Sequence, residues 1–444
     1  MAANRPLCIG MSIAVTWLTG NGWRRADSRV EDIYSPDFYI DLAKRAENAK
    51  LDFLFRPDTL FIDPQSAARS PSFSSLDPSV LLAAIAGETR RIGLVSTAST
   101  TFYPPYIVAR QIQSLNWISR GRAGWNVVTA LDGQRNFGLD SMPPSRERYE
   151  KALEFTDVVR RLWQSYPHDA LAIDRCKGEY AQADRLRPIG HRGRFFSVEG
   201  PLNVPDAGSG AIPLFQAGAS DWGRDFAARI ADGVFAATPD SAAGVELRAD
   251  LRRRAQAHGR RPDAIRLLPG LSLYLGKNRR EARELYQETH ANLALERRYA
   301  GIREMLGVDL SRLPPDQPIT ARMLPAPLAR TRSQTHADLL RRLILRERLT
   351  VGELLQRPEV IGSAHWLVVG TAEDALREII ARTQAGAADG FIALPGGSPA
   401  SLDCFFDDLL PLLVEQGLFR RDYDGATLRQ HLGMDPPSQT PTDR

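Results

Sequence analysis

The chain has 444 residues, enough for two or three domains or for one large α/β barrel with insertions. Its 43% hydrophobic and 25% charged residues are ordinary for a globular protein, and a net charge of +4 does not demand a nucleic-acid partner. The three cysteines, Cys8, Cys176 and Cys404, lie far apart, and no Cys/His cluster indicates a disulfide framework or a metal site. Without a signal-peptide core or a long apolar run, the sequence predicts a cytoplasmic protein that does not span a membrane.

Strand-like and helix-like segments alternate along the chain. The predicted strands begin at Leu7, Leu51, Ile92, Ala123, Ile212, Gly233, Ile265 and Gly390. A helix from about Ser145 to Trp163 follows the fourth of them. Because this alternation favours a parallel sheet, and eight parallel strands in one domain suggest closure, we predict an α/β fold, a (β/α)8 TIM barrel. A doubly wound sheet is the alternative.

Two insertions interrupt the alternation, at approximately residues 165–211 and 276–365. The second lies between the seventh and eighth predicted strands. Loops that follow barrel strands build the active site, so we predict that this larger insertion is a helical lid. Residues 1–433 are expected to form a single domain, and the Pro/Ser/Thr-rich residues 434–444 a disordered tail.

The stretch Gly121–Ala130 begins as a turn, becomes a strand and ends beside a polar loop. Val127 and Val128 suit a buried strand, whereas Asn126 and Thr129 bring an amide and a hydroxyl to its end. Leaving such groups buried and unpaired costs about 1–3 kcal/mol each. The pattern therefore indicates a ligand rich in carbonyls, ring nitrogens and hydroxyls, such as a flavin.

Further motifs follow one another in a fixed order. They are Gly22-Trp23-Arg24, Phe55-Arg56-Pro57-Asp58, Ser96–Thr100, Arg148-Tyr149, Gly200–Pro205, Gln216–Ser220, Val369–Thr371, Ala388–Phe391 and Tyr423–Arg429. With these motifs, nearly the whole chain resembles the bacterial luciferase-like flavin monooxygenases. Within that family it is most similar to the branch of nitrilotriacetate monooxygenase, dibenzothiophene-sulfone monooxygenase and the large subunit of pristinamycin IIA synthase.

The resemblance implies a barrel that takes FMN in its reduced form, FMNH2, from a separate NAD(P)H:FMN reductase. With O2, the flavin would form a C4a-(hydro)peroxide that oxygenates a small organic substrate. The cofactor then performs the difficult step, which agrees with the absence of a strong acid–base or nucleophile motif. Relatives form homodimers or larger assemblies, so a homodimer or homotetramer is expected.

Three predicted flavin ligands lie at the ends of the second, third and fourth strands. By the resemblance, Asp58 lies at the flavin site, although an acid there could also cap the next segment. The Thr97 hydroxyl could bond to the ring, or Thr97 could only favour a strand. The Asn126 amide can donate and accept, which matches the edge of the ring, but it could instead make a structural bond inside the barrel.

A second group of predicted flavin ligands lies at the start of two helices. Ser145 is a natural helix N-cap at a position where the family usually has histidine; it could still bind a ligand oxygen, but a serine cannot carry a proton at neutral pH. Tyr149 lies one turn further along the same face and, by the resemblance, reaches the phosphate; a core aromatic is the alternative. Gly218, Ala219 and Ser220 open a helix, where exposed N–H groups favour a phosphate.

Two other functions stay open. The same fold could carry an F420-dependent oxidoreductase, which transfers hydride without activating O2. Because Ser145 departs from the family pattern, a catalytically silent flavin-binding protein is another alternative. Substrate identity does not follow from these residues, although Trp17, Trp23 and Phe55 would form an aromatic wall if their loops converge, which hints at an apolar or aromatic substrate.

Overall fold

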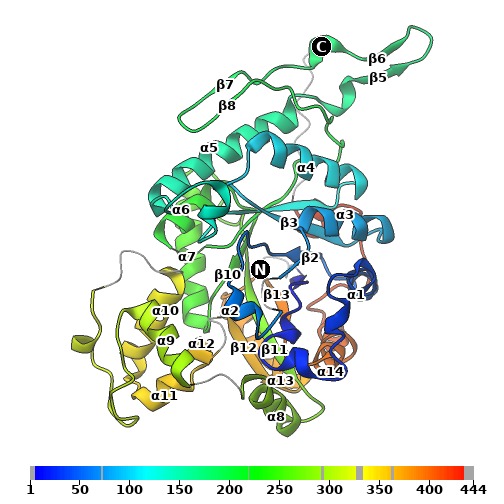
Figure 1. The fold of residues 1–444 in the computed structure, drawn as a ribbon. Helices are drawn as coiled ribbons and strands as arrows, with labels where there is room; N and C mark the ends of the chain where they lie inside the picture. Colours follow the sequence, from blue (N-terminus) through cyan, green and yellow to red (C-terminus); the bar gives the residue numbers. More distant parts are fainter. Residues whose placement is uncertain are drawn as a thin grey trace.

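The computed structural model describes residues 6–71, 74–218, 220–291, 295–326, 334–361 and 365–434. Within these ranges, eight parallel strands close into a barrel (Figure 1). They are β1 (Cys8–Ser12), β2 (Phe53–Arg56), β3 (Gly93–Ser99), β4 (Ala123–Val128), β9 (Leu214–Gln216), β10 (Gly233–Ala236), β11 (Arg266–Leu275) and β13 (Gly390–Pro395). The barrel closes where β13 pairs with β1, with Gly390 opposite Cys8. The predicted TIM barrel and its eight strands are confirmed.

Helices surround the barrel in the order that the sequence predicts. They are α1 (Pro36–Asn48), α3 (Pro78–Glu88), α4 (Pro105–Ile118), α5 (Ser145–Gln164), α6 (Asp221–Ile230), α7 (Ser241–Ala257) and α13 (Ala372–Gln384), with α14 (Pro399–Asp403) and α15 (Leu410–Glu415) towards the end. Local signals set where they begin. In α3, for example, Asp77 accepts hydrogen bonds from the N–H groups of Ser79 (2.8 Å) and Val80 (3.1 Å), and Pro78 takes the first helical position.

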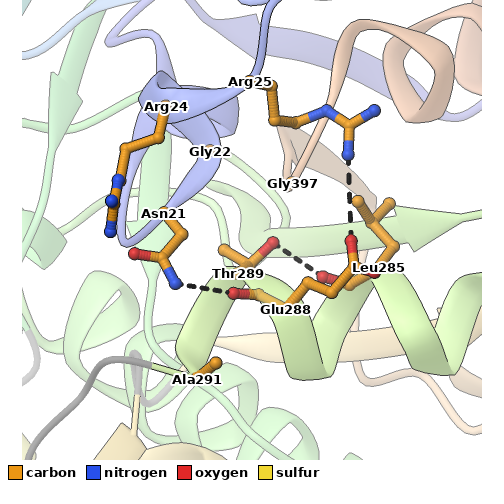
Figure 2. A pocket seen from close by; sticks show the side chains of 9 residues that line it. All are labelled: Asn21, Gly22, Arg24, Arg25, Leu285, Glu288, Thr289, Ala291 and Gly397. Carbon is orange, nitrogen blue, oxygen red and sulfur yellow. Dashed lines mark hydrogen bonds and ion pairs between the residues drawn. The ribbon is translucent and has the colours of Figure 1, made fainter.

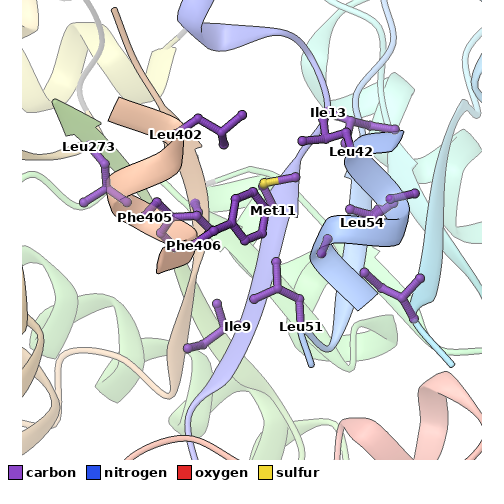
Figure 3. Packing of buried hydrophobic residues seen from close by; sticks show 14 of the residues in the cluster. Ile9, Met11, Ile13, Leu42, Leu51, Leu54, Leu273, Leu402, Phe405 and Phe406 are labelled. Carbon is purple, nitrogen blue, oxygen red and sulfur yellow. The ribbon is translucent and has the colours of Figure 1, made fainter. Parts of the chain in front are cut away.

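Side chains alternate between the inside of the barrel and the surrounding helices. Ile9 and Met11 of β1 and Ile13 just after it point outward and pack against the helices, together with Leu54 and Phe405 (Figure 3). A separate cluster fills the interior, built from Cys8, Phe53, Phe55, Val95, Phe215, Leu268 and Ile392. Since period-2 alternation sends neighbouring residues to opposite faces, each strand contributes to both layers.

The first insertion forms two small antiparallel hairpins. They are β5 (Leu171–Asp174) with β6 (Glu179–Ala181), and β7 (His191–Arg192) with β8 (Ser197–Val198). In Figure 1 both extend beyond α4 and α5. Glu154 of α5 anchors the second hairpin by accepting hydrogen bonds from Phe196 N (2.9 Å) and His191 Nε2 (3.0 Å).

The second insertion is helical, as predicted. It contains α8 (Arg279–His290), α9 (Leu295–Leu306), α10 (Gln334–Glu347), α11 (Val351–Leu355) and α12 (Pro358–Ile361). Apolar residues of α9 and α11 and of the loops between the helices form a cluster of their own, which includes Ile302, Leu306, Val351 and Leu354. The second insertion therefore has its own small core beside the barrel.

A ninth strand, β12 (Trp366–Gly370), was not predicted as a strand. It pairs with the C-terminal half of β11, from Leu271 opposite Trp366 onwards. The edge is open there because the pairing with β10 ends at Pro269, which has no N–H to donate. None of the helices in the described ranges is long and apolar enough to cross a membrane.

Candidate active site

A large cavity lies at the C-terminal ends of the barrel strands, with a volume of about 1310 Å³. Its barrel wall includes Ser12, Phe55, Phe235, Ser272 and Leu394, from β1, β2, β10, β11 and β13. The α9 and α12 helices of the second insertion line its other side. Ligand pockets usually measure about 300–1,000 Å³, so this cavity has room for more than one small molecule.

Thr97 and Asn126 meet inside the barrel mouth, on the neighbouring strands β3 and β4. Their positions are paired in the sheet register, and Asn126 Nδ2 donates a hydrogen bond to Thr97 Oγ1 at 2.9 Å. Both side chains are buried, and within the described part of the chain Asn126 Oδ1 has no hydrogen-bond partner. Whichever way the amide is turned, one of its two polar atoms stays unpaired. That atom can form a hydrogen bond with a ligand that carries ring N–H groups and carbonyls.

A second polar cluster lies where β9 turns into α6. A Cβ at Gly218 would lie 2.5 Å from Gln216 Nε2 and 3.0 Å from Tyr149 Oη, so only glycine fits without displacing these groups. Ser220 caps α6, because its Oγ accepts a hydrogen bond from Gly223 N at 3.2 Å. Gln216 Oε1 is buried and has no hydrogen-bond partner among the described residues. The turn thus brings a hydroxyl, an unpaired amide and the start of a ten-residue helix together, which suits a phosphate.

Tyr149 is a core aromatic residue whose hydroxyl points to the turn before α6. Its ring is buried and packs against Phe226 of α6, with ring centroids 5.7 Å apart. Its hydroxyl reaches the turn, since a Cβ at Gly223 would lie 2.9 Å from Tyr149 Oη. The third residue predicted in this turn, Ala219, lies outside the described residues.

The expected N-cap role of Ser145 is wrong. Pro144 holds the N-cap position of α5 and makes no side-chain cap, and Ser145 is the first helical residue. Proline fixes an extended φ that suits the entry to a helix, which moves the boundary back by one residue. Ser145 remains half-buried, one turn before Tyr149 on α5.

Asp58 lies half-buried in the loop after β2. Burial, followed by the negative charge of Asp77, raises the pKa of the Asp58 carboxyl to about 6. Burial and the charges of the same two acids raise the pKa of Tyr103 to about 12, so the three groups face one another. The helix caps that follow β2 are formed by Asp63 on α2 (Pro64–Ala67) and by Asp77 on α3, which leaves Asp58 free of that role.

Arg56, the neighbour of Asp58 in the motif, does not belong to the site. Phe53 and Phe55 point into the barrel, so Leu54 and Arg56 point outward. Arg56 Nη1 donates a hydrogen bond to the Ile13 carbonyl at 2.6 Å, and its guanidinium lies 5.5 Å from the ring centroid of Tyr39 on α1.

Three cavity residues on β11 and α8 were missed from the sequence. Tyr274 packs edge-on against Tyr286 (4.9 Å) and lies 5.7 Å from His290. His290 Nδ1 lies 2.8 Å from the Tyr286 carbonyl oxygen, so Nδ1 carries the proton and Nε2 is left as an acceptor. Burial lowers the pKa of His290, which keeps the ring neutral. The signals available were a tyrosine at the end of a long strand and a Tyr/His pair four residues apart.

The predicted aromatic wall is only partly present. Trp23 and Phe55 line the cavity, but Trp17 is buried in the core against Phe38, with ring centroids 6.0 Å apart.

Comparison with known proteins agrees with this geometry. Residues 11–389 match the model of the family described as luciferase-like monooxygenase. The chain belongs to the luciferase-like monooxygenase family. It is 34% identical to nitrilotriacetate monooxygenase component A of Aminobacter aminovorans, with 99% of each chain covered. It is 33% identical to dibenzothiophene-sulfone monooxygenase of Rhodococcus erythropolis, covering 94% of this chain and 93% of the relative.

Among solved structures, this member of the luciferase-like family is similar to a riboflavin lyase with modified FMN and riboflavin. The TM-score is 0.83 at 30% identity, covering 98% of this chain and 97% of the other. The resemblance inferred from the motifs is thereby confirmed. The protein is an oxygenating oxidoreductase of a flavin-dependent family.

Proposed function

We propose that this protein is the oxygenating component of a two-component system. It takes FMNH2 from a separate NAD(P)H:FMN reductase and uses O2 to oxygenate a small organic substrate. The observation that carries this proposal is the pair of unpaired buried amide atoms at the barrel mouth, on Asn126 and on Gln216 beside the turn of Gly218 and Ser220. The relative named as a "component A" and the FMN-bearing neighbour support it.

Reduced FMN, when bound, supplies the activation of O2. Thr97 and Asn126 would hold the edge of the flavin ring, because the unpaired amide atom of Asn126 lies inside the buried mouth. Tyr149 Oη, Ser220 and the start of α6 would hold the phosphate. The Asp58 carboxyl, with its pKa of about 6, can hold or release a proton near neutral pH.

The second insertion acts as the predicted lid over the cavity. Helices α9 and α12 line the cavity with Gly301, Glu304 and Ile361, among others, and a separate apolar cluster holds the helices of the insertion together. Its main task is to keep water from the reacting groups. A homodimer or homotetramer stays a prediction from the resemblance.

The decisive experiment titrates the purified protein with FMNH2 without oxygen, then admits O2 and records stopped-flow spectra. We expect a long-lived species whose spectrum differs from both reduced and oxidised flavin, because a closed site protects it from water. FMNH2 in buffer alone is the control and should return directly to oxidised flavin.

Direct return to oxidised FMN in the protein, with candidate substrates present, would contradict the proposal. Tight FMN binding without such a species would point to the silent flavin-binding alternative. Preferential binding of F420 would point to the hydride-transferring alternative.

A further inference from the structure

Three exposed arginines line the cavity mouth. Arg24 lies on the β1–α1 loop, Arg69 follows α2, and Arg297 lies on α9. All three are exposed, and none of their side chains forms an ion pair or hydrogen bond with another described residue. Their neighbour Arg25 differs, since it pairs with Asp27 (3.0 Å) and approaches Glu288 (3.9 Å). Figure 2 shows Arg24 directed away from Arg25 and Glu288.

The three arginines come from segments that adjoin one another. Trp23 Nε1 donates a hydrogen bond to the Arg69 carbonyl at 3.0 Å, which joins the Arg24 loop to the segment of Arg69. The charge of Arg297 acts on Asp63, the residue that caps α2 just before Arg69. Three like charges therefore gather around one mouth. Such an arrangement is unfavourable alone and favourable once an anion binds.

Two carboxylates among the described lining residues offset this charge only in part. Asp63 is already engaged by α2, because it accepts hydrogen bonds from Ser66 Oγ (2.6 Å), Ser66 N (3.0 Å) and Gln65 N (3.3 Å). Glu304 lies on the cavity face of α9. The mouth keeps an excess of positive charge, and the neutral His290 does not alter it.

Deeper in the cavity, aromatic and aliphatic side chains lie beside neutral polar ones. Phe55 and Phe235 stand 5.2 Å apart by ring centroid on the barrel side, and Leu394, Val360 and Ile361 add further apolar surface next to polar residues such as Ser12 and Ser272. A ligand that satisfies both regions has an apolar body and an anionic group at one end. The forked guanidinium donors of arginine match a carboxylate particularly well.

We propose that the substrate is an organic carboxylate, held at its anionic end by Arg24, Arg69 and Arg297 with its apolar part over Phe55 and Phe235. This inference rests on the proposed function. It adds an anionic group to the apolar or aromatic substrate at which the sequence hinted. The phosphate of FMN is also anionic, so the test must separate the two ligands.

The test uses calorimetric titration of the full chain, saturated with FMN, with matched pairs of aryl and alkyl carboxylates and their carboxamides. We expect carboxylates to bind at least about tenfold more tightly than their amides, as a charge-assisted hydrogen bond provides. The preference should disappear in the triple variant Arg24→Gln, Arg69→Gln, Arg297→Gln. Arg110→Gln is the matched control, an exposed arginine on α4 outside the cavity lining, and should keep the preference.

Equal binding of acids and amides, binding of neither, or a preference that survives the triple variant would overturn the inference. A loss of FMN affinity in the triple variant, with carboxylate preference unchanged, would assign the arginines to the cofactor and also overturn it. Single variants and melting curves separate these results from misfolding. Failure of the oxygen experiment with the carboxylate preference intact would refute the proposed function but keep the anion site.

Discussion

The buried polar side chains at the two ends of strand β4 differ in how completely they are hydrogen-bonded. At the N-terminal end, Arg122 is 2% exposed and donates five hydrogen bonds from its guanidinium to carbonyl and hydroxyl oxygens of the surrounding turns. At the C-terminal end, Asn126 is equally buried and keeps one amide atom unpaired. Four residues apart, one polar group is fully satisfied and the other is not.

The contrast extends to the whole barrel. The N-terminal end is closed by the C-terminal segment, whose helix α16 (Leu428–His431) inserts Leu428 and is followed by the equally buried Leu432. Asp52 there accepts hydrogen bonds from Ile9 N (2.7 Å) and from Arg420, and His431 Nε2 lies 2.7 Å from the Arg91 carbonyl. The other end holds the cavity and the unpaired amides. The satisfied groups stabilise the fold, whereas the unpaired amides of Asn126 and Gln216 lie where a ligand can complete their hydrogen bonds.

The largest effect is expected for Arg122→Ala. The variant removes all five hydrogen bonds and leaves buried carbonyls unpaired, so the free energy of unfolding should fall by about 3–5 kcal/mol. Urea unfolding measures it. Arg122→Lys keeps the charge but not the forked guanidinium, so it should recover only part of the lost free energy of unfolding. A stable variant that loses only FMN affinity would break the comparison.

Asn126→Ala should act mainly on the ligand. Because one amide atom is kept for the ligand, its removal should weaken FMN binding about 10- to 100-fold, whereas loss of the hydrogen bond to Thr97 should lower the free energy of unfolding by only about 1 kcal/mol. Quenching of flavin fluorescence gives the affinity. The control is Asn116→Ala on α4, where Asn116 Nδ2 is satisfied by Ser209 Oγ at 3.1 Å. That variant should lose stability and keep FMN affinity.

Gly218→Ala sharpens the assignment of the phosphate cluster. The new methyl group would displace Gln216 Nε2 or Tyr149 Oη, so FMN affinity should fall roughly tenfold, while riboflavin, which lacks the phosphate, should be affected much less. The measured quantity is the ratio of FMN to riboflavin affinity. An equal loss for both ligands would mean that this turn does not hold the phosphate.

Much of the fold follows from the sequence because its signals are local. Alternating apolar residues, proline at first helical turns and the Thr371/Asp374 capping box all fall where the structure has them. The outward direction of Arg56 was also readable, since Phe53 and Phe55 already occupy the inner face of β2.

The site was less predictable because it depends on packing between distant segments. Thr97 and Asn126 could be placed from strand ends, but the cavity face of α9 is decided by how the second insertion packs beside the barrel. The place where β12 joins the sheet depends on where the pairing between β10 and β11 ends. The Ser145 cap failed for a local reason, because Pro144 already occupied the position.

The smallest effect concerns pH at the cavity end. An unfolded aspartate ionises near pH 3.9, whereas the folded Asp58 carboxyl has a pKa of about 6 because it is buried and faces Asp77. A raised carboxyl pKa means that folding disfavours the ionised form, so wild-type stability falls as pH rises from about 4 to 6 and stays lower above it. After allowance for solvent screening, Asp58→Asn should be more stable by about 1 kcal/mol at about pH 7.5 and equal to wild type at about pH 4. Urea unfolding at both pH values tests this prediction. Asp77→Asn is the companion variant, because the asparagine can still cap α3. The lost charge should lower the pKa of Asp58, so this variant should gain part of the same stability. A pH-independent difference would show that Asp58 stays ionised in the folded protein and does not hold a proton at the cavity end.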